Sequence, residues 1–193
     1  MSEAAEDRAK AAKLPEGDVI RILLEQHASV HDLFATIESS AGAERKEAFD
    51  SLRALLAVHE TAEEMVLRPV SRRTAGDSVA QSRNEEEDKA SRVLADLEKM
   101  DVASAEFERT LGEFKSDVTK HAKQEENQEF PAILAQCDEA ERQKMGKVLQ
   151  TAEKTAPTHP HPVAAGSTTA QYALGPFASL MDRARDTIKS AAG

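Results

Sequence analysis

Apolar residues recur at steps of three and four along four long stretches of the chain. Each stretch predicts an amphipathic helix of about 20–27 residues with one face turned toward a core. The helices are expected at 18–40, 43–67, 77–100 and 104–130. The inward stripe of the first helix is Ile20, Leu23, His27, Val30, Phe34 and Ile37, and that of the second is Phe49, Leu52, Leu56, His59, Glu63 and Val66. The stripe of the third is Glu87, Ala90, Leu94 and Leu97, and that of the fourth is Phe107, Leu111, Phe114, Val118, His121 and Glu125. Short connections between them favour an all-α, up-down-up-down four-helix bundle with additional C-terminal helices.

Local signals divide the chain further. Gly17-Asp18 resembles a helix start with the aspartate as N-cap, and Gly76-Asp77 repeats the signal. The expected organisation is a flexible N-terminal segment at 1–17, the bundle at 18–135, a short accessory helix at 138–154, a linker rich in Pro, Ser and Thr at 155–173, and an amphipathic helix at 174–193.

The C-terminal part carries two further features. His159 and His161 are flanked by prolines, and we read them as exposed loop residues because no helix would hold them together as ligands. The apolar stripe of the last helix could pack on the bundle, on a partner subunit or on a membrane surface. Its polar face mixes acidic and basic residues, which favours packing over lipid contact. The oligomeric state stays open, with this helix as the candidate contact.

Composition narrows the class of protein. Only 4 % of the 193 residues are aromatic and tryptophan is absent, while alanine, leucine, glutamate, lysine and arginine dominate, which is a helical composition. A net charge of −10 without a clustered basic stripe argues against a nucleic-acid partner. No apolar run approaches the roughly 18–20 residues of a membrane span, and no secretory signal is visible. The single cysteine, Cys137, cannot form an internal disulfide and fits a reducing cytoplasm, where we read it as an incidental thiol.

A repeated motif carries the candidate chemistry. The pattern H-x3-E-E-x4-P runs from His59 to Pro69 and again from His121 to Pro131. Residues four apart on a helix lie on one face, about 6 Å apart along the axis. Each copy therefore presents one imidazole and one carboxylate in the same direction, and two copies facing each other would suit a pair of metal ions.

The bundle topology predicts that these groups meet. In an antiparallel bundle the starts of the first and third helices lie at the same end as the finishes of the second and fourth. Counting residues from that end places one candidate from each helix roughly 14 Å inward, and two more lie one turn nearer the end. These six candidate ligands are His27, His59, Glu63, Glu87, His121 and Glu125.

A plainer alternative is that these histidines and glutamates are ordinary structural residues. A single histidine on an apolar face is usually a core residue with one hydrogen bond, and an H-x3-E pair can be a surface contact. Six such groups at one level would instead bury several carboxylates, which costs many kcal/mol without a compensating cation. Glu60, Glu64 and Glu126 adjoin the inner face and could support the ligands, although solvated positions fit them equally well.

The donor types indicate the metal. Thiolates are missing, which disfavours a structural zinc cluster or an iron–sulfur centre. A mixed imidazole and carboxylate set suits a dinuclear iron centre, with manganese as the less favoured alternative. Glu63 and Glu125 are the bridging candidates, and the three histidines are the terminal candidates.

With these residues in view, the chain from about 18 to 135 resembles the hemerythrin-like family of HHE cation-binding domains. The paired motifs, ending in "LRP" and "EFP", carry the resemblance. It implies a four-helix bundle with two non-haem iron ions, bridged by carboxylate or oxo groups, that binds dioxygen, senses oxygen or iron, or handles peroxide or nitric oxide. By position, the implied ligands are His27, His59, Glu63, His121 and Glu125.

The third helix departs from the family pattern. Glu87 stands where the family commonly has histidine, and His31 on the first helix is a further candidate ligand that would compensate. Carboxylate-rich ligation stabilises ferric iron and argues against reversible oxygen carriage. We therefore expect chemistry on O2, H2O2 or NO, including catalase-like turnover, while a sensor or iron-handling module without turnover and a purely structural metal site are the alternatives.

Overall fold

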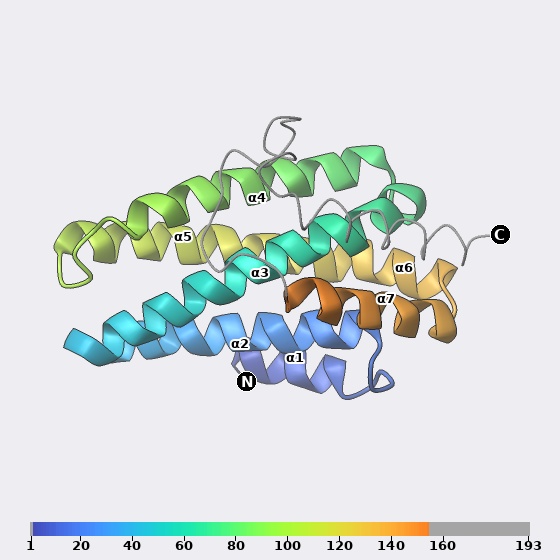
Figure 1. The fold of residues 1–193 in the computed structure, drawn as a ribbon, viewed down its shortest axis with the longest axis horizontal. Coiled ribbons are helices and arrows are strands. Elements are labelled where there is room, and N and C mark those ends of the chain that lie inside the picture. The colour runs from blue at the N-terminus through green and yellow to red at the C-terminus, as the bar shows by residue number, and fades with distance from the viewer. Residues whose placement is uncertain (1, 155–193) are drawn as a thin grey trace.

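The computed structural model describes residues 2–154, and all of its regular elements are helices. They are α1 (Glu3–Ala11), α2 (Val19–Ser39), α3 (Gly42–Thr74), α4 (Asp77–Leu97), α5 (Ala105–Gln124), the π-helix η1 (Glu125–Glu129), α6 (Phe130–Gln136) and α7 (Glu139–Glu153). Helices α2, α3, α4 and the continuous rod α5–η1–α6 run alternately up and down, which confirms the all-α bundle (Figure 1). None of the described helices has an apolar stretch long enough to cross a membrane.

The helix starts follow from local chemistry. The Asp18 side chain accepts a 3.0 Å hydrogen bond from the backbone N–H of Ile20 and so caps α2. Gly17 precedes it with φ of 80°, a conformation that costs glycine little. Ser104 caps α5 in the same way through the backbone N–H of Phe107. These caps set where α2 and α5 begin. They therefore also set how far each later residue of these helices lies from the end of the bundle.

The bundle core consists of two apolar clusters with a polar layer between them. Along α2, Leu23 belongs to the cluster near the start of the helix and Val30 to the other, with His27 in between. Along α3, Leu56 belongs to the far cluster and Val66 to the near one. The residues predicted as ligands on α2 and α3 therefore lie in one slab, walled by apolar packing above and below.

Two helices extend beyond their expected ends. Helix α3 continues through Pro69 to Thr74 although the proline lacks a backbone N–H, so the helix end expected near residue 67 was wrong. The fourth rod changes from α to π geometry over η1 and then continues past Pro131 as α6. Single π-turns inside α-helices are frequently found at functional sites. Here the π-turn begins at Glu125, and both Glu125 and Glu129 are fully buried.

Two short helices flank the bundle. Residues 3–11 were expected to be a flexible segment but form α1, which packs on α2 with Ala4, Asp7 and Ala11 buried (Figure 1). Helix α7 packs on α2 and α3. The predicted linker at 155–173, with His159 and His161, and the predicted helix at 174–193 lie outside the described residues.

Candidate metal centre

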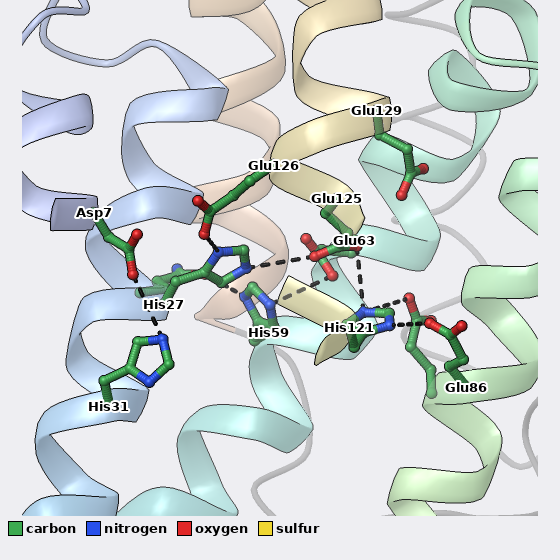
Figure 2. Close-up of polar contacts among 12 residues, drawn as sticks. Asp7, His27, His31, His59, Glu63, Glu86, His121, Glu125, Glu126 and Glu129 are labelled. Atoms are coloured by element: carbon green, nitrogen blue, oxygen red, sulfur yellow. Dashed lines mark hydrogen bonds and ion pairs between the residues drawn. The ribbon is translucent and has the colours of Figure 1, made fainter. Parts of the chain in front are cut away.

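The six predicted ligands come together in two overlapping groups. One contains His27, His59, Glu63 and Glu125, and the other contains Glu63, Glu87, His121 and Glu125. Within each group the potential ligand atoms all lie within 4.8 Å of one another. Glu63 from α3 and Glu125 from η1 belong to both groups, so two neighbouring ions could share their carboxylates (Figure 2).

The two groups differ in their donors. The first offers two imidazoles and is closed, since His27 and His59 are both buried and their ring centroids lie 5.3 Å apart. The second offers one imidazole and one additional carboxylate, because α4 supplies Glu87. Its histidine, His121, is the most accessible of the three at 15 % exposure. The second position is therefore both more anionic and more open.

Each of the three histidines is held at its Nδ1 atom by an outer partner. His27 Nδ1 lies 3.1 Å from Glu126 Oε1, and His121 Nδ1 lies 2.9 Å from Glu86 Oε2 (Figure 2). His59 Nδ1 lies 2.7 Å from the amide oxygen of Gln26. Each imidazole thereby turns its Nε2 atom toward the shared glutamates, at 3.4 Å from the nearest carboxylate oxygen in all three cases. Outer partners of this kind orient and tune metal-binding histidines.

A buried arginine also enters the cluster. Arg68, 2 % exposed, donates from Nη2 to Glu125 at 2.6 Å and to Glu87, and lies 3.5 Å from Glu63. Its Nη1 donates to both oxygens of Glu129, at 2.6 and 2.8 Å. The hydroxyl of Ser71 also donates to Glu129. The guanidinium thus supplies positive charge to the four buried glutamates of the cluster, Glu63, Glu87, Glu125 and Glu129.

One guanidinium leaves this carboxylate set short of positive charge. Burial and the charge of Glu125 raise the pKa of Glu63 well above its ordinary value, against the opposing effect of Arg68. Burial likewise raises the pKa of Glu87 to about 7, although Arg68 and His121 act in the other direction. The pKa of Glu125 is instead lowered, because His121 and Arg68 outweigh its burial. Additional cations would stabilise the ionised carboxylates.

The unsatisfied atoms of the first group fit a cation. His27 Nε2, Glu63 Oε1 and Glu125 Oε2 are buried and make no hydrogen bond within the described residues. Buried polar atoms are rarely left without partners. All three belong to the first group, and imidazole nitrogen with carboxylate oxygen suits iron and similar transition metals. The residues present therefore fit the predicted metal.

Protons and metal would compete for the histidines. Burial opposes the charged form of His27, but the neighbouring carboxylates of Glu125 and Glu126 raise its pKa to about 9. Burial and the charge of His27 lower the pKa of His59 to about 3, so this imidazole stays neutral. A metal needs neutral imidazoles, so binding would release the His27 proton.

A cavity of about 130 Å³ reaches the cluster. His27, His59, Glu87 and His121 contribute to its wall from the centre. The remaining wall combines apolar and polar side chains, among them Val30, Leu56, Glu60, Ala90, Val118 and, toward the exposed side, Lys89, Asp117 and Lys120. The space holds several waters or a diatomic molecule, and a bulky organic substrate would not fit in it.

The other candidate residues have separate places. His31 turns toward α1, at 3.5 Å from Glu3 and 3.6 Å from Asp7, and belongs to neither group (Figure 2). Glu126 supports His27, as the sequence allowed. Glu60 accepts a 2.6 Å hydrogen bond from Ser91 beside the cavity, whereas Glu64 is exposed.

The sequence reading missed the residues that surround the ligands. Arg68 stood inside the motif, between the glutamates and the proline, but arginine is seldom fully buried and nothing in the motif marked it as a partner of the ligands. Glu129 follows Glu125 at helical spacing and could have been recognised as a further inward carboxylate. Gln26 gave no signal, since a glutamine next to a histidine is ordinary on a helix.

A helical bundle that gathers imidazoles and carboxylates from facing helices is an architecture found in di-metal proteins. Residues 18–133 match the Hemerythrin HHE cation binding domain family, which is more than half of the chain. The chain therefore belongs to this family, as the motifs predicted.

Two relatives are consistent with the assignment. An uncharacterised hemerythrin-like protein of Schizosaccharomyces pombe is 26 % identical over 137 residues, which cover 69 % of this chain and 68 % of the relative. The crystal structure of a hemerythrin HHE cation binding domain-containing protein from Mycobacterium kansasii superposes with a TM-score of 0.62 and 21 % identity, covering 84 % of this chain and 96 % of the other. That likeness supports the fold.

Proposed function

We propose that this protein is a non-haem di-iron protein that reacts with hydrogen peroxide, dioxygen or nitric oxide. The observation that carries the proposal is the pair of four-residue groups that share Glu63 and Glu125. His27 and His59 complete one iron position, and Glu87 and His121 complete the other. Iron bound there would supply Lewis acidity and redox chemistry.

The protein would contribute a path for a small molecule, apolar side chains that limit water at the site, and a carboxyl group that can carry a proton. The cavity meets the second position at His121 and Glu87, so a small molecule would arrive on that side. Val30, Leu56 and Val118 line the same space and limit the water beside the site. Glu60 also lines it, and burial raises its pKa to about 8, so this carboxyl can hold or release a proton near neutral pH.

The test begins with metal content. The purified protein is loaded with ferrous iron without oxygen, freed of excess metal, and assayed for iron per chain, for its visible and near-ultraviolet spectrum, and for consumption of hydrogen peroxide. We expect two ions per chain, a new absorption band after exposure to air, and peroxide loss far above that of the metal-free protein. A chain that retains no iron, with an unchanged melting temperature, would contradict the proposal.

A second candidate function is a metal sensor or iron-handling module without turnover. The observation that favours it is the contact between Gln26 and Glu153, which links His59 to α7. Full iron loading with no consumption of peroxide, dioxygen or nitric oxide would support this function over the first.

A further inference from the structure

Helix α7 is firmly attached to the bundle although it lies outside the matched family region, residues 18–133. Met145, Leu149 and Ala152 are buried in the apolar cluster next to the metal centre. A Cβ atom on Gly146 would stand 2.1 Å from the carbonyl oxygen of Gly17, so only glycine permits this approach. The last turn of α7 is thereby fixed beside α2.

That last turn reaches the candidate ligands through one glutamine. The side-chain amide of Gln26 donates from Nε2 to the carboxylate of Glu153. Its Oε1 lies 2.7 Å from Nδ1 of His59. The contacts form a continuous chain from α7, through α2, to an imidazole on α3.

The donors and acceptors in this series of hydrogen bonds are fixed from Glu153 to His59. An ionised carboxylate only accepts hydrogen bonds, so Glu153 requires the NH2 group of Gln26 to face it. The amide oxygen then faces His59 and requires the hydrogen of the neutral imidazole to sit on Nδ1. His59 Nε2 is left with its lone pair directed at the cluster, 3.4 Å from Glu63 Oε2. This is the tautomer that binds a metal through Nε2.

His59 differs in this respect from the other two histidines. Nδ1 of His27 and Nδ1 of His121 each face a carboxylate directly, so their orientation needs no third residue. An amide can present either its oxygen or its NH2 group. With the amide reversed, Nδ1 of His59 would become the acceptor, the hydrogen would move to Nε2, and the metal could not bind there.

We propose that Glu153 is a positioning residue that selects the metal-binding tautomer of His59 by fixing the orientation of the Gln26 amide. The inference rests on the proposed function for its consequence, since the tautomer matters when a metal is bound. It assigns α7, an element beyond the matched domain, a part in assembling the two-histidine position. The tautomer itself can be measured without any metal.

The decisive variant is Glu153→Lys, which replaces an acceptor by a donor and should reverse the amide. Nitrogen-15 NMR of the metal-free protein should show the His59 hydrogen on Nδ1 in the wild type and on Nε2 in the variant. Zinc, a diamagnetic probe, should bind the two-histidine position about 10–100-fold more weakly. Glu139→Lys, which makes the same charge change at an exposed position of α7, should behave as wild type.

A rescue separates positioning from packing. In the double variant Gln26→Glu/Glu153→Lys, the new carboxylate accepts from both neighbours, so the Nδ1 hydrogen and the zinc affinity should return. Should the single lysine variant fail to fold, Glu153→Met supplies the test, because an unconstrained amide should give a mixture of both His59 tautomers. An unchanged tautomer in a folded Glu153→Lys or Glu153→Met variant, or no recovery in the double variant, would overturn the proposal. If the wild type and the variants show the expected His59 tautomers but none of them binds zinc, the proposed function is contradicted and the positioning role of Glu153 is not.

Discussion

Arg68 donates a 2.6 Å hydrogen bond to Glu125, one of the two carboxylates shared by both candidate iron positions. The guanidinium therefore partly neutralises the shared glutamates. Its own pKa is raised, because the surrounding carboxylates outweigh its burial, so the charge is permanent. The metal-free protein thus has one permanent positive charge in the cluster, and iron would bind beside it.

Loss of that cation should destabilise the metal-free protein. Arg68→Met leaves Glu63, Glu87 and Glu125 without their arginine partner, and removing one partner of a buried ion pair costs about 3–5 kcal/mol. Chemical unfolding of the metal-free protein measures the loss, and iron should restore part of it by binding the same carboxylates. Arg72→Met, at an exposed position of α3, is the matched control. Equal stability of the two variants would argue against this role for Arg68.

The stoichiometry of bound iron should follow the two groups. Glu125 belongs to both, so Glu125→Ala should abolish binding of both ions, whereas Glu87→Ala should leave the two-histidine position and one ion per chain. His31→Ala should keep two ions, since His31 pairs with α1. Metal analysis after anaerobic loading measures the ratio. Loss of an ion from His31→Ala would place that histidine among the ligands after all.

The stability of the metal-free protein should fall as the pH rises above neutrality. The pKa of His27 is raised from 6.5 to about 9, so its stabilising protonation is fully present below pH 6.5 and is lost as the pH rises to 9. The pKa of Glu87 is raised from 4.5 to about 7, so the stability that its protonated form contributes is lost as the pH rises from 4.5 to about 7. Thermal unfolding at pH 6 and pH 9 measures the difference.

Iron binding should have the opposite pH dependence. Protons compete with the metal at His27, so iron affinity should rise between pH 6 and pH 9. Direct titration at both pH values, with proton release recorded in weakly buffered solution, provides the check. Parallel pH trends for metal-free stability and iron affinity would show that the groups titrating in this range are not the ligands.

The sequence predicted the parts of the fold that depend on local pattern. The inward stripes predicted four helices, and Asp18 caps α2 as expected, whereas Asp77 is the first residue of α4 and does not cap it. The motif spacing, combined with antiparallel topology, was sufficient to predict that His59 and His121 lie near the same shared carboxylates. These features need only helix geometry and a choice of bundle.

The remainder depends on contacts between distant segments. Arg68 is buried because carboxylates from α4 and η1 surround it, and no local pattern encodes that arrangement. Helix α3 runs through Pro69 because the packing of Val66, Leu67 and Val70 holds both sides of the proline in the core. The N-terminal residues form α1 because Ala4 and Ala11 are buried when the helix packs on α2. Tertiary packing decided each of these cases.

Glu60 provides the sharpest test of turnover. It lines the cavity, its pKa of about 8 permits proton exchange near neutral pH, and it belongs to neither ligand group. Glu60→Gln should therefore retain two iron ions while peroxide consumption falls about 100-fold, the lower range for loss of a general acid or base. Glu64→Gln, the same change at the exposed neighbouring turn position, should retain full activity. Steady-state rates across pH 6–9 decide the matter, because a wild-type transition that belongs to Glu60 should be absent from Glu60→Gln. An active variant with the same pH profile as the wild type would exclude Glu60 as the proton carrier.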